Sequence, residues 1–368
     1  MSAQQLVDKL LIENLKALQP YQSARRLFKS DDLAEQPGWL NANESPFANE
    51  YNLNCERLNR YPDCQPASVI NAYASYAGVN KDQVICSRGA DEGIELLIRA
   101  FCTPGQDKIL ICPPTYGMYA ISAETFNVGV EKAPLKADFS LDISAINSFK
   151  DKVKLVFICS PNNPTGTDVA GQQLTQVLDT FAGNALVVVD EAYFEFSQQA
   201  SWAGKLAQYP NLVVLRTLSK AFALAGIRCG FTLADNAVIQ ALLKVIAPYP
   251  VPDPVAQIAK QALSSAGISQ MQQQVSVLND EKTALSIELG KISQIELVGD
   301  TAANFILFRT PAKQALMDYL VKNGLIIRDQ SRQLALDNCL RISIGNPSQN
   351  QRLIELIQQF FTPEQTAS

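Results

Sequence analysis

Between about residues 80 and 235, short apolar runs rich in β-branched residues alternate with stretches that have helical spacing. The apolar runs read DQVICS, KILIC, KLVFICS, ALVVVD, NLVVLRT and CGFTLA, and helical patterns such as RGADEGIELLIRAF separate them. Continuous apolar strands joined by helices are typical of a mostly parallel sheet covered on both faces. The alternation therefore predicts an α/β fold, in which ligands bind at the carboxyl ends of the strands.

The length of 368 residues is enough for about two domains. Beyond about residue 280 the pattern changes to strand-like ANFILFRT, helical AKQALMDYLVKNG, strand-like LRISIG and a last helix, which predicts a smaller α+β domain. We therefore expect an N-terminal arm over 1–45, a large domain over 46–280 and a small domain over 281–368. The arm is amphipathic, and we expect it to pack against the small domain or a partner subunit.

The composition excludes several classes of protein. Histidine is absent, which removes Ser-His-Asp and Cys-His catalysis and histidine metal sites. The net charge of −5 argues against nucleic acid and anionic membranes as partners, and no stretch approaches the ~18 apolar residues of a membrane span. The eight cysteines form no CxxC pair, so reduced thiols are favoured over disulfides or a metal site. We expect a soluble, cytoplasmic protein without a metal.

Polar residues follow four of the predicted strands. The first two of these segments, taken alone, are weak indications of a binding site. Residues 86–93, CSRGADEG, form a small-residue turn before a helix, whose N-terminus could bind a phosphate or could simply be capped. The loop SPNNPTG, residues 160–166, could aim an asparagine amide into a site or could be a plain turn.

The other two strand ends carry stronger signals. Asp190 ends a buried strand, where its carboxylate needs a cation or a donor, either a protonated heterocycle nitrogen or a nearby Lys or Arg. Lys220 follows a buried strand and precedes a run of small residues. A partly desolvated lysine has a lowered pKa and can act as an amine nucleophile.

The run TLSKAFALAG resembles the cofactor-lysine signature of class II aminotransferases, within fold type I of the pyridoxal-phosphate enzymes. The loops SPNNPTG and DEAY occur in the same order and at similar spacing. The segments LNANES, NRYPDCQP, CPPTYGMY and RTLSKAFALAGIRCGF further resemble the bacterial histidinol-phosphate aminotransferases, over nearly the whole chain. The resemblance implies a seven-stranded sheet in the large domain and pyridoxal 5′-phosphate as the cofactor. It also implies amino transfer between L-histidinol phosphate and 2-oxoglutarate in histidine biosynthesis.

The resemblance also implies roles for residues around the cofactor ring. Lys220 would form a Schiff base with the cofactor and then move the proton between the substrate α-carbon and the cofactor C4′. Asp190 would pair with the protonated pyridine nitrogen, so that the ring can accept electrons. Asn163 and Tyr193 would hydrogen-bond the phenolic oxygen, and Tyr116 would stack on the ring.

A second set of residues would bind phosphate groups and substrate. The cofactor phosphate would be held by the backbone N–H groups of Ala90 and Asp91, by Ser219, and by Arg228. Tyr61 would reach the phosphate of the other subunit's cofactor, which requires a homodimer. The residues expected on the substrate side are Arg341, Arg328, Tyr21 and Asn43. An arginine fork suits a carboxylate or a phosphate, although Arg328 could instead pair with Asp329 or another surface acid. The residues give no independent reason for a role of Asn43.

The sequence is also compatible with two other enzymes of the same fold, and two further classes of protein were considered. A threonine-phosphate decarboxylase or an aromatic aminotransferase of the same fold would share the cofactor residues. A ligand-sensing domain of a transcription regulator would need an added DNA-binding segment, and none is evident before residue 45. A nicotinamide dehydrogenase is disfavoured because no G-x-G-x-x-G follows the first strand.

Overall fold

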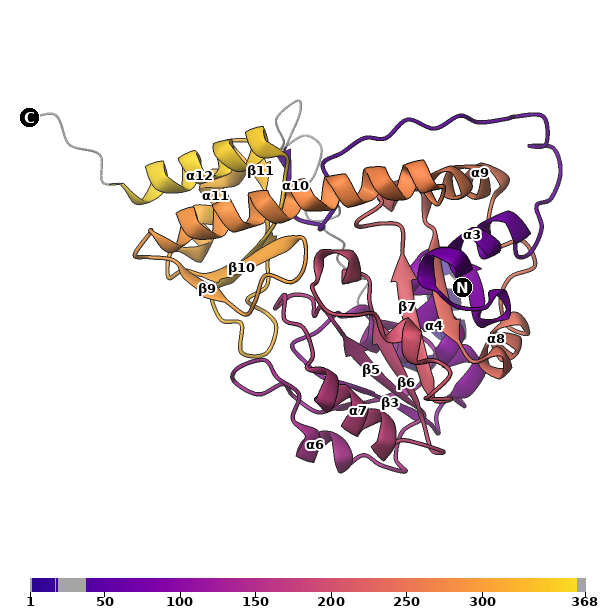
Figure 1. Ribbon diagram of the computed structural model, residues 1–368. Coiled ribbons are helices and arrows are strands. Elements are labelled where there is room, and N and C mark those ends of the chain that lie inside the picture. The colour runs from indigo at the N-terminus through magenta and orange to yellow at the C-terminus, as the bar shows by residue number, and fades with distance from the viewer. Residues whose placement is uncertain (1, 17, 19–37, 363–368) are drawn as a thin grey trace, which may run out of the picture.

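The computed structural model describes residues 2–16, 18 and 38–362. Figure 1 shows a large α/β part and a smaller part, with the long helix α10 (Ser265–Gly290) running from one to the other. Within the described residues, no helix is both long and apolar enough to cross a membrane.

The large part is built on a seven-stranded sheet in the order β2-β8-β7-β6-β5-β3-β4. Its strands are β2 (Val84–Ser87), β3 (Lys108–Ile111), β4 (Gly129–Lys132), β5 (Leu155–Cys159), β6 (Leu186–Asp190), β7 (Leu212–Thr217) and β8 (Gly230–Ala234). Neighbouring strands are parallel except where β8 pairs with β2 and β7. The mostly parallel sheet predicted from the sequence is therefore confirmed.

Helices cover both faces of this sheet, as the continuous apolar strands predict. One face packs against α4 (Ala90–Phe101), α5 (Met118–Thr125) and α8 (Asn236–Leu243). The opposite face packs against α3 (Ala67–Ala77), α6 (Ile143–Asn147) and α7 (Gly171–Thr180). Successive strand residues alternate between the two layers, so Phe157 is buried on the first face and Val156 on the second.

The small part has a four-stranded antiparallel sheet in the order β12-β13-β10-β9. Its strands are β9 (Glu296–Val298), β10 (Phe305–Arg309), β12 (Arg328–Asp329) and β13 (Cys339–Ser343). The helices α11 (Lys313–Lys322) and α12 (Pro347–Phe361) pack with α10 against it, and Leu316, Leu353 and Leu285 share one buried cluster with Phe308. The α+β character expected beyond residue 280 is present.

The chain ahead of the large sheet contacts both parts. Strand β1 (Gly38–Trp39) pairs in parallel with β11 (Leu325–Ile326) of the small part. Helix α2 (Glu13–Lys16) lies on α5 of the large part, where the Asn14 side chain donates to the Glu124 carbonyl over 2.9 Å. Helix α1 (Ala3–Leu10) has no buried residue. Helix α10 continues α9 (Asp253–Ala262) and passes through residue 280, so the domain limits at 45 and 280 stay predictions.

The sheet brings three loops to one edge. Strands β5, β6 and β7 are adjacent and parallel, and Cys159 at the end of β5 lies opposite Asp190 at the end of β6. Because parallel strands end at the same edge, the loops that carry Asn163, Tyr193 and Lys220 start side by side. This edge faces the small part.

Candidate active site

A cavity of about 420 Å³ opens at the carboxyl edge of the large sheet, between the two parts. Residues 41–43, the ends of β5, β6 and β7, and the strands β12 and β13 all contribute to its wall. Most of the residues predicted for the site line it, namely Asn43, Ala90, Asp91, Tyr116, Asn163, Asp190, Tyr193, Ser219, Lys220, Arg228, Arg328 and Arg341.

Lys220 lies three residues beyond the end of β7. Its Nζ donates a hydrogen bond to the Ala42 carbonyl over 2.9 Å and lies 5.7 Å from the centre of the Tyr193 ring. Burial, together with the positive charge of Arg341, lowers the pKa of Lys220 to about 8. A substantial fraction of this amine is therefore neutral near pH 8, which is the form that attacks a carbonyl carbon.

Asp190 is the last residue of β6 and is almost completely buried. Its Oδ2 accepts a hydrogen bond from the Tyr119 hydroxyl over 2.6 Å, and its Oδ1 accepts one from the Ala192 backbone N–H over 3.1 Å. Burial raises the pKa of Asp190 to about 6, although both donors act in the opposite direction. A buried anion of this kind favours a cationic partner in the cavity.

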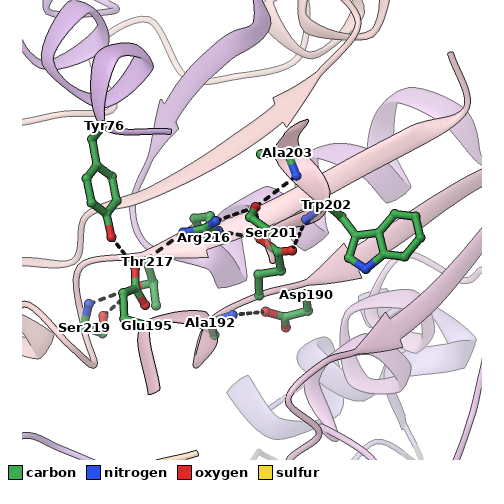
Figure 2. Close-up of polar contacts among 11 residues, drawn as sticks. Tyr76, Asp190, Ala192, Glu195, Ser201, Trp202, Ala203, Arg216, Thr217 and Ser219 are labelled. Atoms are coloured by element: carbon green, nitrogen blue, oxygen red, sulfur yellow. Dashed lines mark hydrogen bonds and ion pairs between the residues drawn. The ribbon is translucent and has the colours of Figure 1, made fainter. Parts of the chain in front are cut away.

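Figure 2 shows a buried ion cluster near Asp190, which bears on whether Asp190 itself forms a salt bridge. Arg216 of β7 donates from Nε to Glu191 over 2.7 Å and lies 3.5 Å from Glu195. Ser201 bridges the pair, since it donates to Glu191 and accepts from Arg216. The arginine therefore pairs with Glu191, the neighbour of Asp190, and Asp190 makes no ion pair within the described residues.

Tyr193 and Asn163 meet in a polar network that crosses between the two parts. The Tyr193 hydroxyl accepts hydrogen bonds from the side chains of Asn43 over 2.9 Å and Asn163 over 3.5 Å. The Asn163 Oδ1 accepts one from Arg341 Nη1 over 2.5 Å. Asn43 is held in turn by Ser343, whose hydroxyl accepts from the Asn43 N–H over 2.7 Å. These contacts fix the tyrosine hydroxyl at the cavity wall.

The start of α4 forms an anion-binding cradle. Gly89 caps this helix without a side-chain hydrogen bond, so the first N–H groups, at Ala90 and Asp91, have no capping side chain at the cavity. Arg228 Nη1 donates to Ser219 Oγ over 3.3 Å, and Arg228 Nη2 lies 3.2 Å from Asp91 Oδ2. The backbones are close here: a Cβ on Gly230 would lie 2.3 Å from the Gly89 carbonyl carbon.

Two arginines stand opposite each other on the small-domain wall. Arg328 of β12 and Arg341 of β13 are register partners, and both line the cavity. Asp329, the other candidate partner of Arg328, is instead held by Lys313 Nζ over 2.8 Å. A pair of guanidinium groups suits a carboxylate or phosphate of the substrate.

Of the predicted site residues that the structure describes, Tyr61 is the one that does not line the cavity. Tyr61 is 78% exposed and stacks on Tyr249, with the ring centres 4.4 Å apart. Tyr21 lies outside the described residues.

Other residues at the site were not predicted from the sequence. Gln330 and Gln333 line the cavity beside Arg328 and share a hydrogen bond of 2.9 Å. The Asn41 carbonyl accepts from Arg341 Nη2 over 3.0 Å. Tyr119, the partner of Asp190, lies three residues after Tyr116 in the sequence, and that spacing was the only available signal.

These groups fit pyridoxal phosphate. The uncapped start of α4 with Ser219 and Arg228 suits its phosphate, the buried Asp190 suits a protonated ring nitrogen, and Lys220 suits its aldehyde carbon. On a mostly parallel seven-stranded sheet with a small α+β domain, they define a fold type I, pyridoxal-phosphate-dependent enzyme.

The chain belongs to the aminotransferase class I and II family, which it matches over residues 33–357. It is 64% identical over 357 residues to a histidinol-phosphate aminotransferase of Pseudoalteromonas atlantica, covering 97% of this chain and 96% of the relative. The fold is similar to that of the histidinol-phosphate aminotransferase of Clostridium acetobutylicum, with a TM-score of 0.79, 25% identity, and coverage of 88% and 98% of the two chains.

A further solved structure shows the same fold, the histidinol-phosphate aminotransferase of Sinorhizobium meliloti in complex with pyridoxal-5′-phosphate. It has a TM-score of 0.82 at 18% identity and covers 95% of this chain and 98% of its own. The expected fold class, the family and the cofactor are thereby confirmed.

Proposed function

We propose that the protein is a histidinol-phosphate aminotransferase. It would transfer the amino group between L-histidinol phosphate and 2-oxoglutarate, giving imidazole acetol phosphate and L-glutamate in histidine biosynthesis. The observation that carries the proposal is the placement of the paired Arg328 and Arg341 in one cavity with the reactive Lys220. The high identity to a curated relative of that name, over nearly the whole of both chains, supports it.

Lys220 is assigned the covalent and proton-transfer roles. Bound pyridoxal phosphate supplies a ring that accepts the electron pair released when the substrate α-carbon loses its proton. The Lys220 amine, whose pKa is lowered to about 8, would hold the cofactor aldehyde carbon until the substrate amine takes its place, and the released amine would then move the proton between the substrate α-carbon and the cofactor C4′. Its hydrogen bond to the Ala42 carbonyl keeps the amine at the cavity wall.

Three other side chains would orient the cofactor ring. Asp190 would hold the protonated ring nitrogen, because a buried carboxylate with this donor set stays ionised beside a cation. Tyr193 and Asn163 would donate to the phenolic oxygen, and Tyr116 would lie against the ring. The hydrogen bond from the Tyr116 hydroxyl to Asp91, of 2.9 Å, favours this placement.

The phosphate end of the cofactor would bind at the start of α4, to the N–H groups of Ala90 and Asp91, and to Ser219 and Arg228. Tyr61 would complete this site from a second copy of the chain. Its support is its exposure in the single chain, next to the half-exposed Tyr249, and exposed aromatic patches favour burial in an interface. A homodimer is therefore part of the proposal.

On the substrate side, Arg341 would bind the carboxylate of glutamate or the phosphate of histidinol phosphate, with Arg328 beside it. Asn43 and Tyr21 stay predictions as substrate contacts, and the hydrogen bonds of Asn43 favour a role through Tyr193. A cytoplasmic location is also proposed, since all eight cysteines are free thiols.

The test compares three reactions of the purified enzyme. We expect rapid glutamate formation from L-histidinol phosphate and 2-oxoglutarate, and much slower formation with phenylalanine or tyrosine as the amino donor. We expect no carbon dioxide from L-threonine O-3-phosphate. Preferred turnover of an aromatic amino acid, or decarboxylation of phosphothreonine, would instead establish one of the two alternatives of the same fold.

A further inference from the structure

Tyr119 is completely buried under the floor of the cavity, at the start of α5. Its ring stacks on Phe157 of β5, with centres 4.9 Å apart, and its edge meets Tyr116 at 5.6 Å. Phenylalanine would fill this apolar space equally well, so packing alone does not explain the hydroxyl. The hydroxyl donates to Asp190 Oδ2 over 2.6 Å, which is a short, charge-assisted hydrogen bond.

Tyr119 also joins two walls of the site. Tyr116, which lines the cavity, precedes α5 and lies three residues before Tyr119 in the chain, and Asp190 ends β6. The preceding Thr115 is fixed as well, because its hydroxyl donates to Asn162 in the loop that carries Asn163. The position of the Tyr119 hydroxyl is therefore set by its surroundings and does not depend on a mobile side chain.

We propose that Tyr119 is a positioning residue that orients the Asp190 carboxylate and keeps it ionised for the cofactor ring nitrogen. The inference rests on the proposed role of Asp190. Tyr119 itself does not line the cavity, so it would act through that carboxylate.

The charge state of Asp190 depends on several neighbours. Burial raises the pKa of Asp190 to about 6, and the negative charges of Asp91 and Glu191 act in the same direction, whereas the Tyr119 hydroxyl and the Ala192 N–H lower it. Cys159 on β5 and Tyr193 also interact with Asp190, and burial raises the pKa of each. Without the Tyr119 hydroxyl the pKa of Asp190 moves further up, so the carboxylate is protonated at a higher pH.

The test measures cofactor affinity in Tyr119→Phe, by equilibrium dialysis of the loaded enzyme against pyridoxal phosphate at several values between pH 6 and pH 8.5. We expect binding to be weaker by about tenfold, as for a lost hydrogen bond to a charged group. The loss should be larger at pH 6 than at pH 8.5, because fewer Asp190 groups are ionised there. Circular dichroism checks that the variant is folded.

Tyr73→Phe is the matched control. Tyr73 is also completely buried and stacked, on Phe231 at 3.5 Å, but its hydroxyl has no hydrogen-bond partner among the residues described. We expect its cofactor affinity and pH profile to match those of the wild type.

A double-mutant cycle with Asp190→Asn separates the possible failures. If Tyr119 acts through Asp190, Tyr119→Phe adds little to the loss in the Asp190→Asn background. The role of Tyr119 is overturned if Tyr119→Phe weakens cofactor binding equally, and independently of pH, in the wild type and in Asp190→Asn. It is also overturned if Tyr119→Phe causes no loss of binding in either background. In both cases Asp190→Asn alone would still weaken binding, so the role of Asp190 would stand. Unchanged binding in Asp190→Asn overturns the proposed role of Asp190 and, with it, this inference.

Discussion

Arg341 Nη1 donates a hydrogen bond to Asn163 Oδ1, so an arginine of the small domain contacts the loop that follows β5 of the large domain. The same guanidinium donates to the Asn41 carbonyl over 3.0 Å. The Arg341 side chain thus connects strand β13, the segment around Asn41 and the loop that carries Asn163. A substrate anion bound to Arg341 would therefore be coupled to all three segments.

Arg341→Ala should raise KM for glutamate and for histidinol phosphate together, each by roughly tenfold or more, because a charge-assisted fork is lost. Arg341→Lys should recover only part of the loss, since an ammonium group cannot bind bidentately. Arg309→Ala is the control, because this arginine pairs with Glu296 outside the cavity. Steady-state kinetics with each substrate varied would measure the effect. Unchanged KM values for both would remove Arg341 from the substrate site.

Gly230→Ala should weaken cofactor binding and lower the free energy of unfolding by about 1–3 kcal/mol, as expected for overpacking. The added Cβ would lie 2.4 Å from the Ala90 nitrogen and would displace the start of α4. Gly226→Ala is the matched control, because a Cβ there meets nothing within 4 Å. Thermal unfolding and cofactor titration of both variants check this. If the two variants have the same stability and cofactor affinity, the close approach of Gly230 to the start of α4 is not needed.

Asp190→Asn should abolish turnover but stabilise the cofactor-free protein above about pH 7. Burial raises the folded pKa of Asp190 to about 6 from the ordinary 3.8, so the folded state binds more protons than the unfolded state between these values. The wild type therefore loses stability as the pH rises from about 4 to 7, and the variant, which carries no charge, does not. Unfolding curves of both proteins at pH 5 and pH 8 measure this. If the stability of Asp190→Asn exceeds that of the wild type by more at pH 5 than at pH 8, the raised pKa of Asp190 would be contradicted.

Tyr61→Phe should weaken cofactor binding as a property of the dimer. Mixing Tyr61→Phe subunits with Lys220→Ala subunits produces heterodimers in which the only site with Lys220 faces an intact Tyr61 from the partner. We expect that site to bind the cofactor with wild-type affinity, whereas Tyr61→Phe homodimers do not. If the heterodimers and the homodimers bind alike, the two subunits do not share a site.

The sequence predicted the large sheet well because its central strands are buried on both faces and are therefore continuously apolar. It did not indicate β4, whose residues Gly129–Lys132 are half-buried or exposed and carry two charges at the sheet edge. The two-residue strands β11 and β12 are too short to show any periodicity.

The site residues that could be predicted were likewise those that follow the apolar strands. Lys220, Asp190 and Asn163 end up together because parallel strands share an edge, and the sequence shows where each strand ends. Tyr119, Gln330 and the cluster around Arg216 depend on which side chains meet across strands and helices, and sequence spacing does not specify that. Tyr61 is exposed in the single chain, so its proposed role needs a second copy.

The central claim is that Lys220 drives amino transfer from histidinol phosphate, and a single half-reaction tests it most directly. L-Histidinol phosphate would be added to the cofactor-loaded enzyme without 2-oxoglutarate, and the cofactor absorption would be followed, with Lys220→Ala as the control. We predict that the wild type converts fully to the amino form of the cofactor and returns when 2-oxoglutarate is added, whereas Lys220→Ala holds the cofactor but does not convert it. No conversion by the wild type, or equal conversion by Lys220→Ala, would contradict the account.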